Sequence, residues 1–142
     1  MINDAIAKSY EAANYASHAY EQSFIANLHA RSRLRALNPK APNSAKVLEI
    51  GCASGGNLIA QALVFKDAQF TGIELSKAQI KNGKTALEKI GIKNIDLFCL
   101  DICDARRILA RRSLIISSLT VFMPYIKTTA RLFYDGQGAL KG

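Results

Sequence analysis

One short segment, residues 47–57, constrains this chain more than any other; it reads Val-Leu-Glu-Ile-Gly-Cys-Ala-Ser-Gly-Gly-Asn. An apolar strand ends beside an acidic residue, breaks into a turn of small residues and is followed by a helix. Gly51 permits the tight turn, Ala53 keeps bulk away from the backbone, and Gly55 lets helix and strand pack closely. The segment predicts a site where a ligand lies against bare backbone and helix amides. An ordinary strand-to-helix turn has similar spacing, so the segment alone leaves both interpretations open.

Two further predicted strands also end in a carboxylate. Residues 69–73 are followed by Glu74, which comes 23 residues after the first glycine of the turn, and residues 95–100 are followed by Asp101. A spacing of about 20 residues is typical of an acidic residue that binds ribose hydroxyls. In a parallel sheet Glu49, Glu74 and Asp101 would lie along one edge, where ligands bind. Each alone is more often a helix cap or a solvated carboxylate.

The charge of Glu49 separates two classes of cofactor. A dinucleotide places its pyrophosphate on the helix N-terminus, and a carboxylate just before the turn would repel that phosphate. The same carboxylate would attract a sulfonium or ammonium group. The sequence therefore favours S-adenosylmethionine over a nicotinamide cofactor, and a nicotinamide oxidoreductase is disfavoured.

These segments resemble the class I S-adenosylmethionine-dependent methyltransferases. Residues 49–57 look like motif I of that family, residues 72–76 like motif II and residues 100–102 like motif III. The Cys-Ala-Ser-Gly-Gly-Asn run is similar to bacterial methyltransferases that carry a C-terminal methyltransferase regulatory domain. The aromatic run upstream of motif I is similar too, and the resemblance covers residues 8–104.

The resemblance implies a fold and a set of cofactor contacts. The fold would be an α/β, Rossmann-like three-layer sandwich, here incomplete, with three to four parallel strands and an N-terminal helical extension. Glu49 and the turn would hold the methionine portion, Glu74 the ribose hydroxyls, and Leu75, Asp101 and Ile102 the adenine. Ala53 stands where the general family has its middle glycine. The cofactor-binding residues so implied are Glu49, Gly51, Cys52, Ala53, Gly55, Glu74, Leu75, Asp101 and Ile102.

The predicted elements alternate between strand and helix, which favours a parallel sheet. Residues 3–37 are alanine-rich and predict a helix, and residues 38–44 a linker. We expect strands at 46–50, 69–73 and 95–100. The helices between them are expected at 57–65 and from the capping box at Ser76 to a stop at Gly91. The predicted division is therefore a helical segment over 1–40, a cofactor-binding half-domain over 41–104 and a basic tail over 105–142.

Composition bounds the remaining possibilities. The chain has 142 residues, 49% of them hydrophobic, enough for one packed domain. The absence of a long apolar run or a signal sequence predicts a cytoplasmic protein without a membrane partner. The three cysteines have no paired metal spacing and are expected to be apolar packing residues rather than metal ligands.

The charge lies in the tail. Residues 105–142 hold seven Lys and Arg and one acid, a net of +6, whereas residues 1–104 hold twelve and ten, a net of +2. One interpretation is an arm that docks a methyltransferase on RNA. We favour another, in which a frameshift near codon 104 replaced the rest of the enzyme. Residues 113–123 can be back-translated so that a second frame encodes the Phe-Asp-Tyr-Ile-Ile strand and His-Gly loop expected after motif III. Sequencing the encoding DNA tests this.

The expected function is therefore the cofactor-binding portion of a methyltransferase with an unknown methyl acceptor. The alternative is a non-catalytic, truncated fragment that at most binds the cofactor. The sequence predicts no catalytic residue, because in the family that it resembles the catalytic residues normally follow the fourth strand. Residues 114–122 are similar to such a strand only in being apolar. Open sheet edges in such a remnant would favour self-association.

Overall fold

A computed structural model describes residues 16–101 of the chain. The predictions made for residues 3–15, for Ile102, for the strand at 114–122 and for the whole tail and its reading frame lie outside the described residues. In chain order the elements are η1 (Glu21–Ser23), α2 (Ile25–Leu34), η2 (Pro42–Ser44), β1 (Lys46–Ile50), α3 (Gly56–Val64), β2 (Gln69–Glu74), α4 (Lys77–Ile90) and β3 (Ile95–Cys99).

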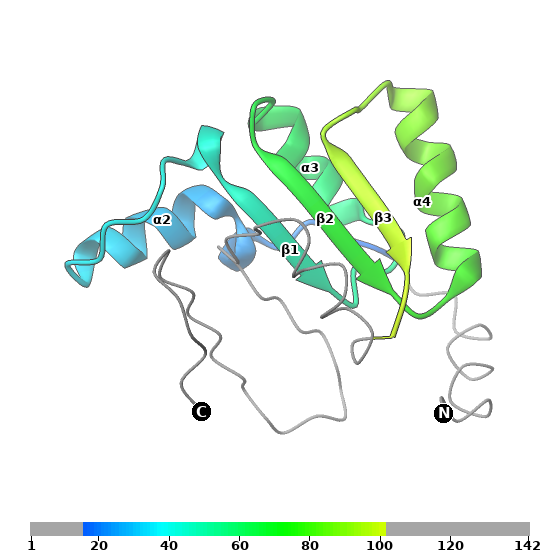
Figure 1. The fold of residues 1–142 in the computed structure, drawn as a ribbon, viewed down its shortest axis with the longest axis horizontal. Helices are drawn as coiled ribbons and strands as arrows, with labels where there is room; N and C mark the ends of the chain where they lie inside the picture. Colours follow the sequence, from blue (N-terminus) through cyan, green and yellow to red (C-terminus); the bar gives the residue numbers. More distant parts are fainter. Residues whose placement is uncertain (1–15, 102–142) are drawn as a thin grey trace.

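The three strands form one parallel sheet in the order β1-β2-β3, with helices in the crossovers (Figure 1). Each predicted strand agrees with the observed one to within a residue. All three strands run in the same direction, so their carboxyl ends meet at one edge of the sheet. The α/β fold and the parallel sheet are thus confirmed within residues 16–101.

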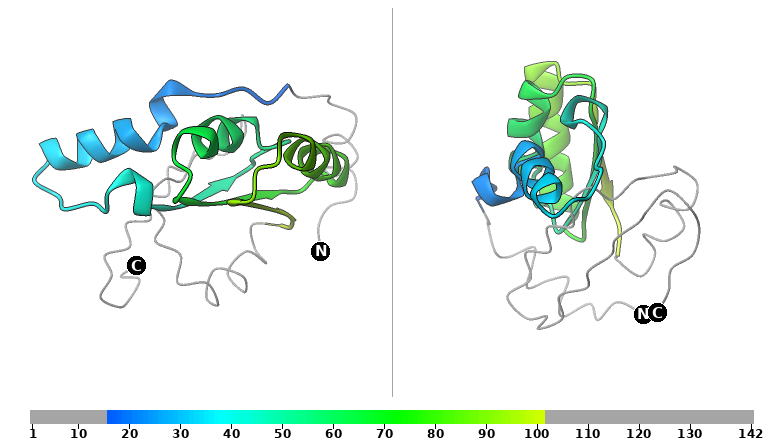
Figure 2. Two further views of the ribbon diagram at one scale, coloured as in Figure 1. Left: turned by 90° about the horizontal axis from the view of Figure 1, so that it is seen from above. Right: turned by 90° about the vertical axis from the view of Figure 1, so that its left-hand side faces the viewer.

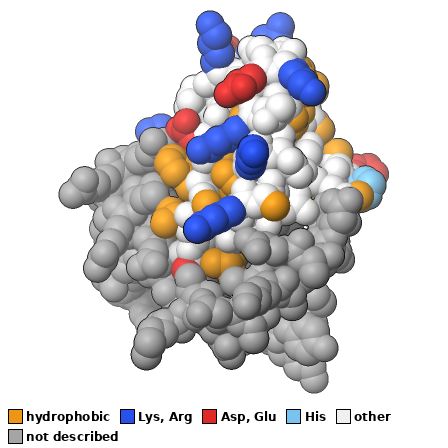
Figure 3. Space-filling model, turned by 90° about the vertical axis from the view of Figure 1, so that its right-hand side faces the viewer, with side chains coloured by type: hydrophobic (Ala, Val, Ile, Leu, Met, Phe, Trp, Pro, Cys, Tyr) orange, Lys and Arg blue, Asp and Glu red, His pale blue; other side chains and the backbone are white. Residues whose placement is uncertain are grey.

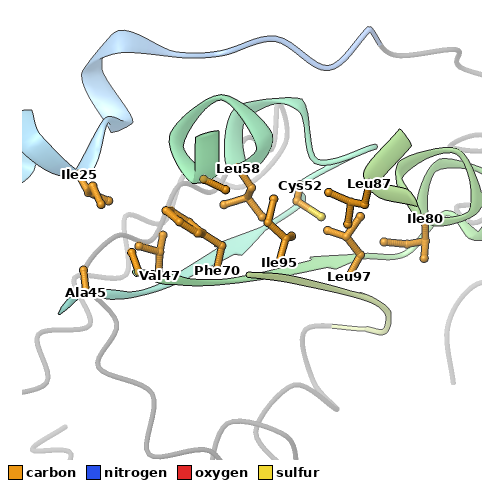
Figure 4. Packing of buried hydrophobic residues seen from close by; sticks show 12 residues of the cluster. Ile25, Ala45, Val47, Cys52, Leu58, Phe70, Ile80, Leu87, Ile95 and Leu97 are labelled. Atoms are coloured by element: carbon orange, nitrogen blue, oxygen red, sulfur yellow. The ribbon is translucent and has the colours of Figure 1, made fainter. Parts of the chain in front are cut away.

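The helices lie on one face of this sheet. Val47, Phe70 and Ile95 share a register row, and they pack against Leu58 of α3 in a single buried cluster (Figure 4). Side chains alternate across a strand, so Glu49, two residues after Val47, points to the same face of the sheet as Val47 does. Figure 2 shows α2, α3 and α4 together on this side of the strands.

The opposite face carries its own apolar cluster. Leu48, Ile50 and Ile73 are buried there, with Leu100 packed against them. No described helix covers this face, so two layers of the expected three-layer sandwich lie within residues 16–101. None of the described helices is long and apolar enough to cross a membrane.

Helix α4 begins and ends as its sequence predicts. The hydroxyl of Ser76 accepts a hydrogen bond from the Gln79 backbone N–H at 3.3 Å, which caps the first turn. Gly91 adopts a left-handed conformation at φ 76, and its N–H donates to the Leu87 carbonyl at 2.9 Å.

The predicted continuous helix over residues 3–37 is wrong over residues 16–24. That stretch, which we call the N-terminal strap, is extended apart from the 3₁₀ turn η1, and the helix α2 starts only at Ile25. The reason is competition: buried side chains of α3 accept hydrogen bonds from the N–H groups of Tyr20 in the strap and of Ile25 at the start of α2, which a continuous helix would have used. Leu34 and Leu37, in the last part of the predicted helix, are 87% and 48% exposed.

Candidate functional site

The loop between β1 and α3 contains three residues in the left-handed conformation. Gly51, Ala53 and Gly55 have φ values of 74, 48 and 80. The N–H groups of Gly51 and Cys52 donate to the carbonyl of Ile73 at 2.8 and 3.2 Å, which fastens the loop to the end of β2. Only Gly adopts this conformation without steric cost, so Ala53 is a strained position. The result is a turn at the carboxyl edge of the sheet in which Gly51, Ala53 and Ser54 are partly exposed.

Leu97 of β3 explains several of the glycines around this loop. Its methyl groups would lie 3.3 Å from a Cβ on Gly55, 2.7 Å from one on Gly72 and 2.6 Å from one on Gly83. These glycines come from the loop, from β2 and from α4, so one leucine fills a hollow that three elements leave. The expected close packing at Gly55 is confirmed. Gly83 also brings α4 against the loop, because its Cβ would lie 2.6 Å from the Ser54 carbonyl oxygen.

Glu49 lies beneath the first turn of α3 and is only 5% exposed. The side-chain amide of Asn57 donates to its two carboxyl oxygens at 3.3 and 3.2 Å. Burial raises the pKa of Glu49 from 4.5 to about 7, although the hydrogen bond from Asn57 works against that rise. The structure therefore places this carboxyl behind the loop, in contact with the helix.

Glu74 lies at the end of β2 and fastens two loops together. Its Oε2 accepts the Ala53 N–H at 3.1 Å, and its Oε1 accepts the N–H groups of Leu75 and Ser76 at 2.7 and 3.0 Å. An ionised carboxylate offers about four acceptor sites. Three are occupied, which leaves Oε2 able to accept one further hydrogen bond from a ligand hydroxyl.

The side chain of Cys52 points into the core rather than to the edge of the sheet. It belongs to the main buried cluster, and a Cβ on Gly72 would lie 2.6 Å from its Sγ (Figure 4). Burial, with the nearby Glu49 and Glu74 carboxyls, raises the pKa of the Cys52 thiol. Only the backbone of Cys52 can therefore face a ligand at this loop.

The remaining predicted residues follow β2 and β3. Leu75 is partly exposed, and its carbonyl accepts the Cys99 thiol at 3.4 Å. Asp101 is partly exposed and comes two residues after the end of β3. The parallel sheet thus brings the ends of all three acid-bearing strands to one edge, whereas Ile102 lies outside the described residues.

Sequence reasoning missed two buried amides of α3. Asn57 contacts Tyr20 and Ser23 of the strap as well as Glu49, and Gln61 accepts the Ile25 N–H at 3.0 Å. These two side chains are four residues apart and so lie on one face of the helix. Two amides at that spacing in an otherwise apolar helix are a signal that could have indicated a docked segment.

Other surfaces of the described part do not offer a comparable site. A shallow depression beside α4 is rimmed by exposed lysines over an apolar base, a face seen in Figure 3. No group of three metal-ligating side chains occurs within residues 16–101. The depression is lined by Lys77, Ile80, Lys81, Lys84, Thr85, Glu88 and Cys99.

Comparisons with known proteins agree with this geometry. A family model described as "Putative methyltransferase" matches residues 43–131, which is more than half of the chain and includes every strand of the sheet. The chain belongs to this methyltransferase family.

Its relatives are longer proteins. The uncharacterized protein RP789 of Rickettsia prowazekii is 35% identical over 95 residues, 67% of this chain and 17% of that protein. The uncharacterized protein RP028 of the same organism is 35% identical over 104 residues, 73% of this chain and 42% of that protein. The chain thus spans less than half the length of either relative.

A solved structure supports the fold. PKMT2 from Rickettsia typhi, in complex with AdoHcy, superposes with a TM-score of 0.60 at 33% sequence identity, over 65% of this chain and 18% of that one. The described sheet and helices therefore have the Rossmann-like arrangement of a methyltransferase, which confirms the predicted fold class.

Proposed function

We propose that this chain is the cofactor-binding portion of an S-adenosylmethionine-dependent methyltransferase. The observation that carries the proposal is the link between Glu74 and the loop. A carboxylate at the end of the second strand accepts the N–H of left-handed Ala53 at 3.1 Å, with an acceptor site still free at the edge of the sheet. Family membership and a structural neighbour that holds AdoHcy support the same cofactor.

The residues present fit this cofactor. The loop from Gly51 to Gly55 offers backbone without side-chain bulk for the methionine portion, and Oε2 of Glu74 has room for a ribose hydroxyl. By family resemblance Leu75, Asp101 and Ile102 would contact the adenine. When bound, the cofactor supplies an electrophilic methyl group. The chain's own part is to bind it and to orient it, which is the main contribution expected for an in-line transfer.

The charge around the loop favours a cationic over an anionic ligand. Glu49 and Glu74 flank the loop from β1 and β2, and both act to raise the pKa of the Cys52 thiol between them. A pyrophosphate at this position would meet the same unfavourable field. A sulfonium carries the complementary charge.

Calorimetric titration with S-adenosylhomocysteine tests the proposal. The native chain should give saturable binding, and Glu74→Ala should weaken it at least about tenfold, because the acceptor for the ribose is lost. Glu88→Ala, an exposed carboxylate of α4, is the matched control and should bind as the native chain does. Absence of binding at millimolar ligand, or tighter binding of NADH, would overturn the proposal.

The methyl acceptor and the compartment also belong to this proposal. The methyl acceptor would bind through residues other than those that hold the cofactor. Two described cysteines, Cys52 and Cys99, are free thiols. Free thiols are the usual state in a reducing compartment, which supports the cytoplasm.

A further inference from the structure

The N-terminal strap is fastened to the turn that follows the cofactor loop. The hydroxyl of Ser17 accepts the Gly56 N–H at 2.8 Å, so it satisfies the first free amide of α3. The approach is close, because a Cβ on Gly56 would lie 2.7 Å from the Ser17 carbonyl oxygen. Gly55 and Gly56 therefore serve two different contacts, one with β3 and one with the strap. Figure 2 shows the strap running along the helix layer.

Asn57 joins this strap to the buried acid of β1. Its Oδ1 accepts the Tyr20 N–H at 2.9 Å, and its Nδ2 lies 3.0 Å from the Ser23 hydroxyl as well as within reach of Glu49. A backbone N–H can only donate, so the amide oxygen must face Tyr20 and the NH₂ group must face the carboxyl. With the amide reversed, its NH₂ group would face the Tyr20 N–H, and its oxygen would face the carboxylate of Glu49. The Asn57 side chain therefore has one allowed orientation, in which it connects the strap to Glu49 of β1.

We propose that Asn57 is a positioning residue of the cofactor site, which couples Glu49 to the N-terminal strap so that cofactor binding fastens the strap over the first turn of α3. The inference rests on the proposed function, because the ligand at the loop is the cofactor named there. By family resemblance Glu49 holds the methionine portion of the cofactor, so a bound ligand would also fix Glu49 and, through it, the amide of Asn57. Such coupling is reciprocal, so a fastened strap strengthens cofactor binding by the same factor.

Amide hydrogen exchange on the full chain, with and without saturating S-adenosylhomocysteine, tests the coupling directly. The Tyr20 amide should exchange about tenfold more slowly when the ligand is present, whereas amides in the centre of β2 should not change. Calorimetry on the same sample separates the two proposals. Measurable binding with an unchanged Tyr20 amide overturns the coupling and leaves the proposed function standing, whereas absence of binding overturns both.

Two matched variants show whether Glu49 is part of the path. Asn57 and Gln61 are both buried, and they accept the N–H groups of Tyr20 in the strap and of Ile25 directly after it, but of the two only the Asn57 side chain contacts Glu49. Asn57→Leu should weaken S-adenosylhomocysteine binding about tenfold and abolish the ligand effect at Tyr20, because it leaves Glu49 unpaired. Gln61→Leu should speed exchange at Ile25 but keep the affinity within about threefold.

Equal losses of affinity in the two variants would contradict the role of Asn57, since they would show that strap packing alone matters. The midpoint of thermal unfolding checks that each variant folds. Should Asn57→Leu fail to fold, the exchange experiment on the native chain still decides the question, because it needs no substitution.

Discussion

The side-chain amide of Asn57 donates to both carboxyl oxygens of Glu49, at 3.3 and 3.2 Å, across the buried contact between α3 and β1. The contact joins the start of the helix to the strand that precedes the cofactor loop. It is also the one place in the described chain where a buried carboxyl has a pKa near neutral. Its protonation therefore affects stability in a pH range that is easy to measure.

The first prediction concerns Glu49→Gln. The pKa of Glu49 is 4.5 when exposed and about 7 in the fold, so the folded state binds the proton more tightly. The stabilisation is fully present below pH 4.5 and is lost as pH rises through 7. Relative to the variant, the native chain should lose up to about 3 kcal/mol of unfolding free energy between pH 4 and pH 8. Denaturant unfolding at several pH values measures this, and a difference between the two proteins that stays constant with pH would contradict it.

The second prediction compares two left-handed glycines. Gly55→Ala and Gly91→Ala both place a side chain at positive φ, which costs about 1 kcal/mol. A Cβ at Gly55 would also meet Leu97 at 3.3 Å, whereas one at Gly91 would meet nothing within 4 Å. Gly55→Ala should therefore be the more destabilising variant, by roughly 1 kcal/mol or more. Equal unfolding midpoints in urea would rule out the Leu97 contact as the cause.

The third prediction is that Gly83→Ala changes the stability in the direction opposite to the one that helix propensity predicts. In the interior of an exposed helix, replacing glycine by alanine stabilises by about 1 kcal/mol. Gly83→Ala should instead destabilise by about 1–3 kcal/mol, because its Cβ would lie 2.6 Å from both Leu97 and the backbone carbonyl of Ser54. Thermal unfolding gives the sign. A higher melting temperature for the variant would show that α4 can move away from the loop at little cost.

The fourth prediction concerns the two described cysteines. Cys52 is buried with a raised pKa, so its thiolate is scarce and shielded, whereas Cys99 is exposed. Iodoacetamide at pH 8 should label Cys99 in the native state and Cys52 only after unfolding. Peptide mass spectrometry of the two labelled samples distinguishes the sites. Rapid native labelling of Cys52 would mean that the core beneath the loop opens readily.

Much of the described fold could be predicted because it follows local rules. The strands were indicated by their apolar runs, and α4 by Ser76 at its start and Gly91 at its end. The position of Glu74 at the carboxyl end of its strand followed from the local strand pattern, whereas the burial of the Glu49 carboxyl against α3 was not predicted. Each of these features depends on residues that are close together in the sequence.

The features that were missed depend on distant contacts. The strap was predicted as helix because its composition favours helix, whereas its extended form depends on contacts with Gly56 and Asn57 of α3, more than 30 residues away. The inward direction of Cys52 depends on the missing side chain of Gly72, which belongs to another strand. The hollow around Leu97 likewise requires three elements to be assembled, so no local pattern could reveal it.

The strap has a consequence for how the chain is made. The α3 partners of Tyr20 in the strap and of Ile25 just after it lie 37 and 36 residues further along the chain, so they have not been synthesised when these two residues are added. At about 5–20 residues per second, synthesis of that interval takes roughly 2–7 seconds. Throughout that time Tyr20 and Ile25 cannot form the bonds that hold them in the finished fold. The strap therefore reaches its final hydrogen bonding only after α3 has been made, and a chaperone that binds the chain before then would find the strap without these partners.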